Sequence, residues 1–314
     1  MKPTILALVG PTGSGKTKTA IAICEALNAE IVSMDSMQIY RGMDIGTAKP
    51  TREELAAAPH HMIDVCDPDQ IFTVSMYRDM ACKVIDSILS RGKRPLLVGG
   101  TGLYLQAISY EISLGEKGAD SKLREELNQI AEKPGGAQEL HRRLEVVDPQ
   151  SAKKLHPNDV RRVIRALEIF ETSGKAKSEQ GNEAFKEGPY HVLVYGLSLP
   201  RDQMYARINA RVDRMISEGL VQEVETLLSK GISPKPEGGA MQAIGYKEIV
   251  SALQGEIPID QAVALIKQSS RRYAKRQWTW FRHDPRTQWF DWTQYASEQG
   301  LIDALIKKIR ADLV

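Results

Sequence analysis

The fold of this chain follows from eight residues, Gly10-Pro11-Thr12-Gly13-Ser14-Gly15-Lys16-Thr17. They have the spacing G-x-x-x-x-G-K-[ST] of a phosphate-binding loop, or P-loop. The apolar run 5–9 before them predicts a buried strand, and residues 18–27 after them predict a helix. Glycines allow several backbone N–H groups to converge on one point, where the helix N-terminus adds partial positive charge. We therefore predict a site for a di- or triphosphate, with Lys16 supplying a charge and Thr17 a hydroxyl for magnesium.

Composition limits the class of protein. The chain has 314 residues, of which 42% are hydrophobic and 26% charged, which predicts one large α/β domain with an insertion, or two domains. The net charge is only +2, so a nucleic-acid surface would have to be local. Cys24, Cys66 and Cys82 form no C-x-x-C pair, which signals neither a zinc site nor a disulfide framework. No secretory signal or apolar run of about 18 residues occurs, so we expect a cytoplasmic protein without a membrane partner.

Residues 30–35 predict a second buried strand, which ends in Asp35. Ligands of open α/β sheets bind beyond the carboxyl ends of the strands, so we expect Asp35 near the P-loop. Two later predicted strands, 94–100 and 190–197, end without the Walker B acid of a hydrolase, which leaves Asp35 as the only acid at a strand end. It would act as a general base, or cap a loop, or help to hold magnesium. Thr101, at the next strand-to-helix junction, should face the same cleft.

The fold class that we predict is α/β, a P-loop NTPase-like parallel sheet flanked by helices, with an all-helical inserted domain. Strand signals are absent from 115 to 189, where short helical segments alternate with Pro and Gly turns. The core would then comprise residues 1–114 and 190–314. Residues 60–65 predict a short strand, on which neighbouring His60 and His61 point to opposite faces and are poor partners for one metal ion.

Two long helices are predicted after the last strand. The first, 202–230, places Arg207, Arg211 and Arg214 on one stripe. The second begins at Asp260, which we expect to cap it, and contains no acid between residues 267 and 283. Aromatic residues are interleaved with its cations, which favours either a polyanion partner or a merely basic surface.

In combination, these motifs resemble the bacterial tRNA dimethylallyltransferase family, also called tRNA isopentenyltransferases. The motifs occur in order from residue 7 to about residue 282, while the C-terminal zinc finger of eukaryotic members is missing. They are the P-loop, Asp35-Ser36-Met37-Gln38-Ile39-Tyr40, residues 42–50 and 97–104, His156-Pro157-Asn158-Asp159-Val160-Arg161-Arg162, Ala243-Ile244-Gly245-Tyr246 and residues 272–277.

The resemblance implies transfer of a dimethylallyl group from dimethylallyl diphosphate, the co-substrate, to N6 of an adenosine in tRNA. That adenosine lies 3′ of the anticodon in tRNAs that read codons starting with U, and the product is N6-isopentenyladenosine. Asp35 would accept the N6 proton, and Arg211 would neutralise the leaving diphosphate. The cofactor Mg²⁺ would be held by Thr17, alone or with Asp35. Thr101 and Arg124 match family positions that matter for activity.

The implied partner is the anticodon stem-loop of tRNA, whose target base must be flipped out of its stack. We expect a monomer. The P-loop is also the pattern of ATP-binding proteins, although this transfer needs only an allylic diphosphate. The implied tRNA-binding residues are Asp35, Ser36, Met37, Gln38, Asn158, Asp159, Val160, Arg161, Arg162, Gln242, Ala243, Ile244, Gly245, Tyr246, Lys247, Arg271, Arg272, Lys275 and Arg276.

Three other functions stay open at the level of the sequence. One is an isopentenyltransferase that acts on free adenine nucleotide, against which the helical insertion and the basic helix argue, since a small acceptor needs neither. Another is an ATP-dependent small-molecule kinase with Asp35 as its base. The last is a non-catalytic RNA-binding module.

Overall fold

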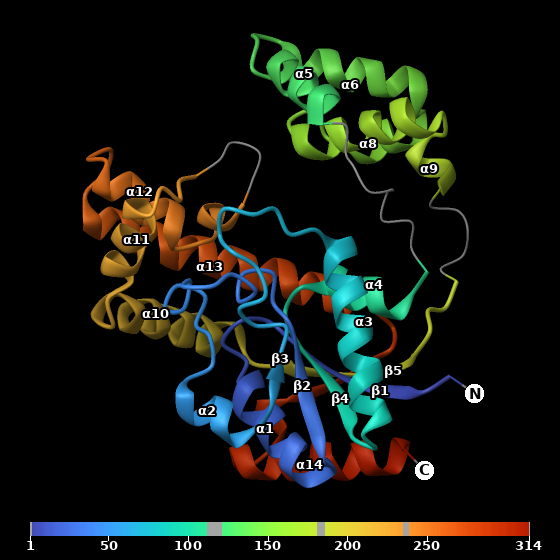
Figure 1. Ribbon diagram of the computed structural model, residues 1–314, viewed down its shortest axis with the longest axis vertical. Coiled ribbons are helices and arrows are strands. Elements are labelled where there is room, and N and C mark those ends of the chain that lie inside the picture. The colour runs from blue at the N-terminus through green and yellow to red at the C-terminus, as the bar shows by residue number, and fades with distance from the viewer. Residues whose placement is uncertain (1, 112–120, 181–185, 235–238, 314) are drawn as a thin grey trace. The chain divides into compact units, whose positions relative to one another are not determined.

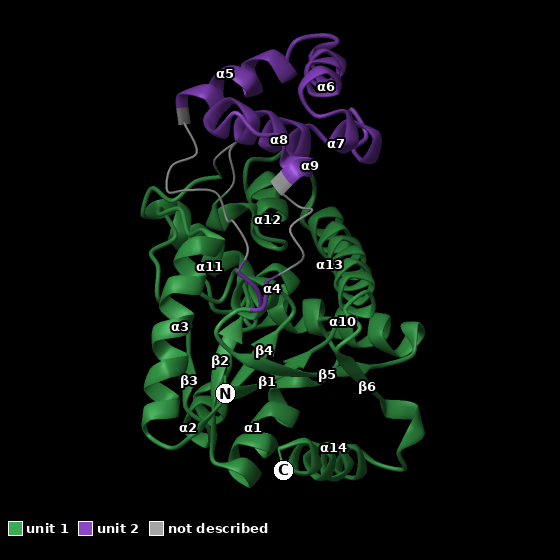
Figure 2. Ribbon diagram, turned by 90° about the vertical axis from the view of Figure 1, so that its right-hand side faces the viewer, with its two compact units in different colours: residues 1–109, 188–314 green, residues 110–187 purple. Residues whose placement is uncertain are grey.

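The computed structural model describes residues 2–111, 121–180, 186–234 and 239–313. The chain divides into two compact units, which Figure 2 shows in different colours: Met1–Ser109 with Gly188–Val314, and Tyr110–Glu187. Residues 115–120 and 181–185 of the expected insertion lie outside the described residues.

The described part of the first unit is built on a six-stranded sheet in the order β3-β2-β4-β1-β5-β6, whose strands are labelled in Figure 2. Every neighbouring pair of strands is parallel, which confirms the predicted α/β class. Strand β1 lies inside the sheet (Figure 1), and the P-loop connects it to helix α1 (Lys16–Leu27). The strands are β1 (Thr4–Val9), β2 (Ala29–Met34), β3 (His60–His61), β4 (Arg94–Gly99), β5 (His191–Ser198) and β6 (Thr287–Asp291).

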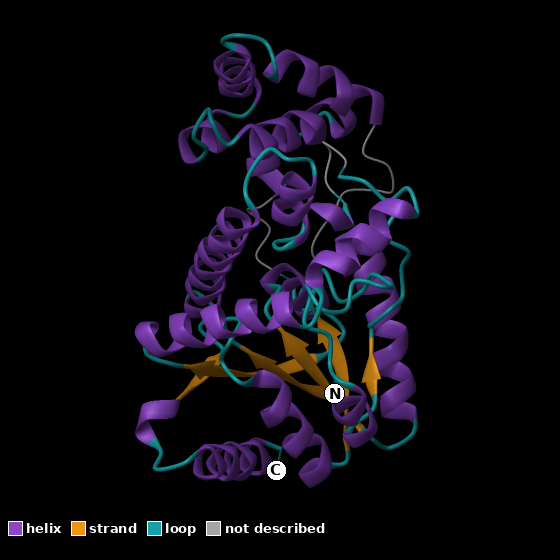
Figure 3. Ribbon diagram, turned by 90° about the vertical axis from the view of Figure 1, so that its left-hand side faces the viewer, coloured by secondary structure: helices purple, strands orange, loops and turns teal. Residues whose placement is uncertain are grey.

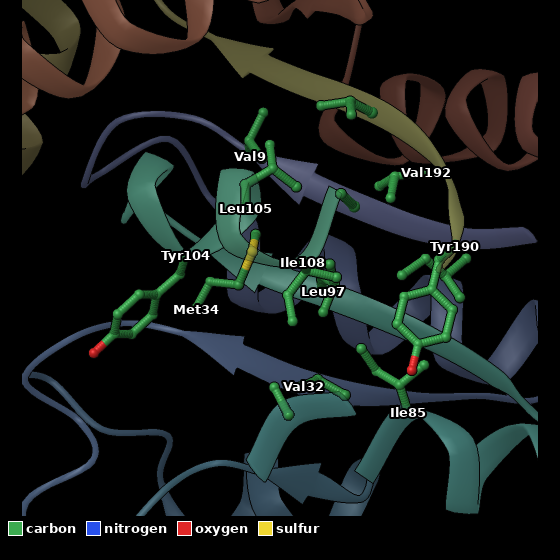
Figure 4. Packing of buried hydrophobic residues seen from close by; sticks show 14 of the residues in the cluster. Val9, Val32, Met34, Ile85, Leu97, Tyr104, Leu105, Ile108, Tyr190 and Val192 are labelled. Carbon is green, nitrogen blue, oxygen red and sulfur yellow. The ribbon is translucent and has the colours of Figure 1, made fainter. Parts of the chain in front are cut away.

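Helices cover both faces of this sheet, as an all-parallel sheet requires (Figure 3). Leu6 and Leu8 of β1 pack on the side of α1 and α14 (Glu298–Asp312). The alternate residues of β1 face the other side, which α3 (Val74–Ser90), α4 (Gly102–Ser109) and the end of α13 (Ile259–Arg282) cover. Figure 4 shows this second cluster, where Met34 and Leu97 from the sheet meet Leu105 of α4.

A separate core lies in the helices after β5. Helices α10 (Arg201–Ser217), α11 (Leu220–Ser229) and α12 (Tyr246–Leu253) pack with the first half of α13. Ile39 and Met43, from the loop that follows β2, are buried in the same cluster. The loop beside the P-loop is thereby attached to this helical block. The other elements of the first unit are α2 (Arg52–Ala57) and the 3-10 turns η1 (Ala240–Gln242) and η2 (Trp292–Gln294).

The described part of the second unit is helical and has its own core, centred on Leu140, Leu144 and Val163. Its helices are α5 (Ser121–Ala131), α6 (Gly136–Val147), α7 (Pro149–Lys154), α8 (Val160–Ser173) and α9 (Lys177–Gln180). Asp159 stands at the N-cap of α8, but its side chain makes no capping hydrogen bond and instead pairs with Arg162 at 3.3 Å.

Several predictions about elements were wrong. The single helix over 202–230 is two helices, because Gly219 takes a left-handed φ of 103° between α10 and α11. The strand over 60–65 ends after His61, since Met62 and Asp64 have φ values of 63° and 55°. Helix α13 begins one residue before Asp260, so that Asp260 lies in its first turn and Pro258 is the N-cap.

Strand β6 and helix α14 were not predicted. Because β6 ends in Asp291, Asp35 is not the only acid at a strand end. Asp291 is used within the protein, since its carboxylate accepts hydrogen bonds from the hydroxyls of Ser198 and Thr293. Within the described ranges, no helix is long and apolar enough to cross a membrane.

Candidate active site

The P-loop bends tightly around the N-terminus of α1. Gly13 and Gly15 adopt left-handed φ values of 83° and 88°, and a Cβ on Gly10 would come within 2.7 Å of the Leu197 carbonyl oxygen. Lys16 Nζ donates hydrogen bonds to the carbonyl oxygens of Gly10 and Pro11 at 2.9 and 2.8 Å. Burial and the neighbouring Arg211 charge lower the pKa of Lys16 to about 7, although Asp35 opposes the shift. The lysine therefore lies inside the loop, within reach of a phosphate that enters it.

Asp35 follows β2 directly and is held in place by the backbone. Its Oδ1 accepts the N–H groups of Met37 at 2.8 Å and Gln38 at 3.3 Å. Among the described residues, no hydrogen bond involves Oδ2. The carboxylate charge raises the pKa of Lys16 in the P-loop and of Tyr273 on α13, which places Asp35 close to both.

Arg211 brings a second positive charge to the P-loop. Its Nη1 donates to Thr12 Oγ1 at 3.0 Å, and its Nη2 donates to the Thr47 carbonyl oxygen at 3.4 Å. Burial lowers the pKa of this guanidinium, while the Asp35 charge raises it. Of the predicted arginine stripe on α10, Arg211 is the member that bonds to the loop, and Arg207 lies over Trp292 instead, 5.4 Å from the ring centroid.

Two hydroxyl groups of the site are buried, Ser14 Oγ in the P-loop and Thr101 Oγ1 after β4. Ser14 Oγ has no hydrogen-bond partner within the described residues, and Thr101 Oγ1 has only the hydroxyl of Tyr273 beside it. Tyr273 lies close to Thr101, and burial, followed by the Asp35 charge, raises the pKa of this tyrosine to about 12. An unsatisfied buried hydroxyl costs about 1–3 kcal/mol. A ligand that supplies hydrogen bonds to these two groups would offset that cost.

Trp292, which the sequence analysis missed, supports the P-loop from outside. Its indole Nε1 donates to the Ser14 carbonyl oxygen at 2.9 Å. Its ring covers Gly15 so closely that a Cβ there would lie 2.9 Å from it. The signal that could have located Trp292 is the aromatic run Trp289-Phe290-Asp291-Trp292. The short strand β6 thus brings the C-terminal part of the chain to the phosphate-binding loop.

The loop after β2 is fastened by two polar side chains. Gln38 accepts a hydrogen bond from Ser33 Oγ at 3.2 Å and donates to the carbonyl oxygens of Thr47 and Ala48. Glu223 of α11 accepts the N–H groups of residues 44–46 and the hydroxyl of Tyr246, the last at 2.5 Å. Gln38 and Tyr246, both expected at the RNA, therefore hold the loop in the structure.

The other expected RNA contacts near this loop differ in exposure. Gln242 and Lys247 are exposed. Ser36, Met37 and Ile244 are half-buried, whereas Ala243 and Gly245 are buried.

The residues fit a magnesium ion that takes most of its ligands from phosphate and water. Thr17 is exposed at the start of α1, where its hydroxyl can reach an ion held by phosphate. The cavity of about 40 Å³ that adjoins Thr17 has a mostly apolar wall without Asp35, so it is not the ion site itself. Hydroxyl and carboxylate oxygens are the ligands that magnesium prefers. No group of three or more His, Cys, Asp or Glu in the described ranges could hold a metal by itself. His60 and His61 bond instead to the Ala58 carbonyl oxygen and to Glu30.

Helix α13 carries the predicted basic surface on one side only. Arg272, Lys275 and Arg276 are exposed. Arg271, by contrast, is half-buried and donates to Asn209 Oδ1 at 2.7 Å, and Lys267 pairs with Asp213 at 2.5 Å. The outward charge of α13 therefore comes from these three residues and from the exposed Arg282 at its end, whereas Arg271 joins α13 to α10.

The expected residues of the second unit also fall into two groups. Asn158 and Arg161 are exposed, as is Arg162, while Val160 and Asp159 are half-buried. Arg124 donates to the buried carboxylate of Glu168 from Nε and Nη2 at 2.6 and 2.8 Å. It therefore joins α5 to α8, and its role in activity stays a prediction.

Two family models match the chain. The model described as "IPP transferase" matches residues 38–284, and the model of the ATPase family associated with various cellular activities matches residues 6–68. A tRNA dimethylallyltransferase from Halalkalibacterium halodurans is 45% identical over 304 residues, which cover 96% of each chain. One from Geobacter sulfurreducens is 49% identical over 292 residues, or 93% of each chain.

Solved structures resemble the chain over a similar length. The full-length tRNA isopentenylpyrophosphate transferase from Bacillus halodurans matches with a TM-score of 0.74 and 43% identity, covering 100% of this chain and 97% of that one. A eukaryotic dimethylallyltransferase acting on tRNA matches with a TM-score of 0.77 and 30% identity, covering 92% of this chain and 74% of that one.

Proposed function

The chain belongs to the tRNA dimethylallyltransferase family, and from that premise we propose which reaction it performs. It transfers a dimethylallyl group from dimethylallyl diphosphate to N6 of the adenosine 3′ of the anticodon, in tRNAs that read codons beginning with U. The observation that carries this proposal is the convergence of Asp35, Arg211 and the P-loop on one site.

The donor side of the site suits a departing diphosphate. The bond between the allylic carbon and the diphosphate oxygen breaks, and its electron pair leaves with the diphosphate. We assign the P-loop amides, Lys16 and Arg211 to the binding of that growing negative charge, because Arg211 bonds to the P-loop and Lys16 lies within it. Thr17, alone or with Asp35, would hold Mg²⁺, which supplies further neutralisation of the leaving group when bound.

The acceptor side of the site suits an amine that must lose a proton. The N6 lone pair forms the new bond to the allylic carbon, and one N6 proton is released. We assign that proton to Asp35 Oδ2, because Oδ1 is already fixed by two backbone N–H groups. Tyr104 is buried and lies close to Asp35, whose charge helps to raise its pKa. Such aromatic walls exclude the water that would otherwise capture the allylic group.

The tRNA backbone needs positive groups on the protein. The exposed cations of α13 and the exposed residues Asn158, Arg161 and Arg162 of the second unit are the groups that we assign to the RNA backbone. The target base has to leave its stack in the anticodon loop, at a cost of a few kcal/mol. We further propose that the protein acts as a monomer in the cytoplasm.

One incubation tests the proposal. The protein is incubated with unmodified tRNA and dimethylallyl diphosphate labelled in the allyl group. The masses of the tRNA anticodon fragments are measured by mass spectrometry before and after the incubation. We expect label and one added isopentenyl mass on the fragment with the adenosine 3′ of the anticodon. Label on free adenine nucleotide alone, or labelling from γ-phosphate-labelled ATP alone, would overturn the proposal in favour of the nucleotide transferase or the kinase. Retention of tRNA without turnover would indicate a binding module.

A further inference from the structure

Helix α13 has a second polar side, which faces the site. On this side Gln277 is buried, with only 6% of its surface exposed. Its Oε1 accepts the N–H of Thr12 in the P-loop at 2.9 Å. Its Nε2 donates to the carbonyl oxygen of Gly100, at the end of β4, at 3.1 Å. One side chain therefore joins three segments that are far apart in the sequence.

The glycines after β4 make this contact possible. A Cβ on Gly100 would overlap the Gln277 amide, and a Cβ on Gly102 would overlap the indole of Trp280. Thr12 is held from two helices at once, because its N–H binds Gln277 and its hydroxyl binds Arg211. The P-loop is thus fixed against the segment that carries the buried Thr101 hydroxyl.

We propose that Gln277 is a positioning residue for the transfer reaction, which sets the distance between the diphosphate in the P-loop and the acceptor beside Thr101. This inference rests on the proposed function. Gln277 touches neither reacting atom in this account. It acts through Thr12 and Gly100, whose separation it fixes by two hydrogen bonds from one rigid amide. Misplacement of reacting groups by about 1 Å can reduce a rate about 100-fold.

Gln277→Leu removes both hydrogen bonds and keeps a side chain of similar size. We expect kcat for tRNA prenylation to fall about 10- to 100-fold, with the KM for dimethylallyl diphosphate changed less than threefold, because the phosphate-binding groups are all retained. The matched control is Gln299→Leu, an exposed glutamine on α14, on the opposite face of the sheet. A kcat within threefold of wild type, or a rise in KM as large as the fall in kcat, would overturn the proposal.

Gln277→Glu supplies a readout that a purely structural role would not move. A protonated carboxyl can accept from Thr12 N–H and donate to the Gly100 oxygen, as the amide does, whereas the carboxylate cannot donate. The groups around this position are Tyr273 on α13, Arg211 on α10, and Lys16 with Asp35 beside the P-loop. They are present in both proteins, so the ratio of variant to wild-type kcat isolates the introduced carboxyl.

That ratio should be highest at low pH and fall at least tenfold as pH rises through the pKa of the introduced carboxyl, which burial and the Asp35 charge raise and the Arg211 and Lys16 charges lower. A ratio that does not change with pH contradicts the positioning role. The melting temperature of each variant is measured in parallel to show that the variant is folded. Recovery of the activity of Gln277→Glu at low pH then shows that its loss at higher pH is not due to unfolding. If the wild-type protein prenylates no tRNA, the proposed function fails first, whatever the variants do.

Discussion

Replacing Asp35 by asparagine should remove the base and leave the loop around it intact. The loop keeps its two hydrogen bonds, because the carbonyl of an asparagine side chain can still accept the N–H groups of Met37 and Gln38 that Oδ1 accepts at 2.8 and 3.3 Å. What changes is the second oxygen, which becomes an amide nitrogen that cannot take a proton from N6. Asp35→Asn therefore separates the chemical role from the structural one.

The size of the effect follows from the chemistry of that one atom. General base catalysis contributes about 10²–10⁴-fold, which corresponds to about 3–5 kcal/mol in the activation barrier. The lost negative charge also acts on Lys16, whose pKa Asp35 raises. Without Asp35 this lysine is less protonated, so the KM for the donor should rise as well, and more at pH 8 than at pH 6. The tRNA affinity should change less than threefold.

The assay measures kcat from steady-state prenylation at saturating donor and tRNA. The affinity for tRNA is measured by filter binding. Asp35→Ala is the comparison, because it also deletes the two hydrogen bonds to the loop and should cost about 2 kcal/mol of unfolding free energy in addition. A loss of kcat below tenfold in Asp35→Asn, or a fall in tRNA affinity that accounts for the loss of activity, would refute the general-base assignment.

Three further predictions concern charges outside this carboxylate. With a pKa of about 7, Lys16 is largely neutral at pH 8 and protonated at pH 6. Donor binding should therefore take up close to one proton at pH 8 and almost none at pH 6. Calorimetry in two buffers of different ionisation enthalpy measures this proton uptake, and equal heats in the two buffers at pH 8 contradict the prediction. Arg272→Glu combined with Lys275→Glu should weaken tRNA binding and reduce the slope of log affinity against log salt concentration by about 1–2. The control Lys307→Glu, on α14, should leave this slope unchanged. An unaltered slope in the double variant would exclude α13 from the RNA-binding surface. Burial alone would raise the pKa of Glu30, but hydrogen bonds from Lys93 and His61 and the Arg91 charge lower it to about 2. About 3 kcal/mol of unfolding free energy that is present above pH 4.5 should therefore be lost as pH falls toward 2. In urea unfolding, Glu30→Gln should reduce this loss of stability at low pH, and an equal loss in the variant disproves the role of Glu30.

Local patterns in the sequence were enough to locate the central strands. Strands β1, β2, β4 and β5 are short apolar runs, and their burial is nearly complete, which is the case that hydrophobic pattern identifies best. Strand β6 is half-buried along most of its length and lies at the edge of the sheet, so it lacks that pattern. The early end of β3 follows from the positive φ values of Met62 and Asp64, which are residue types that seldom adopt them and therefore give no signal in the sequence.

The candidate site divides in the same way. The P-loop is a contiguous motif, and Asp35 is found from the rule that strand ends share one edge of a sheet. Gln277, Trp292 and Glu223 each act on a segment that lies more than 170 residues away in the chain. They have no motif of their own, because an ordinary side chain in an ordinary helix or turn gains its role only from what the fold places opposite it.

The glycines at and after the end of β4 leave no room there for the acid that hydrolases carry. In hydrolases the strand beside the P-loop strand ends in an acid. Here that strand is β4, which ends at Gly99 and is followed by Gly100. A Cβ on Gly99 would overlap the Met34 carbonyl group, and a Cβ on Gly100 would overlap the Gln277 amide. The close approach of α13 leaves no space for an acidic side chain at that point. Asp35, which follows the next strand, β2, lies near the P-loop, whereas Asp291 after β6 bonds to Ser198 and Thr293. Under the proposed function, a carboxylate in that position serves an acceptor beside the phosphates, as group transfer requires.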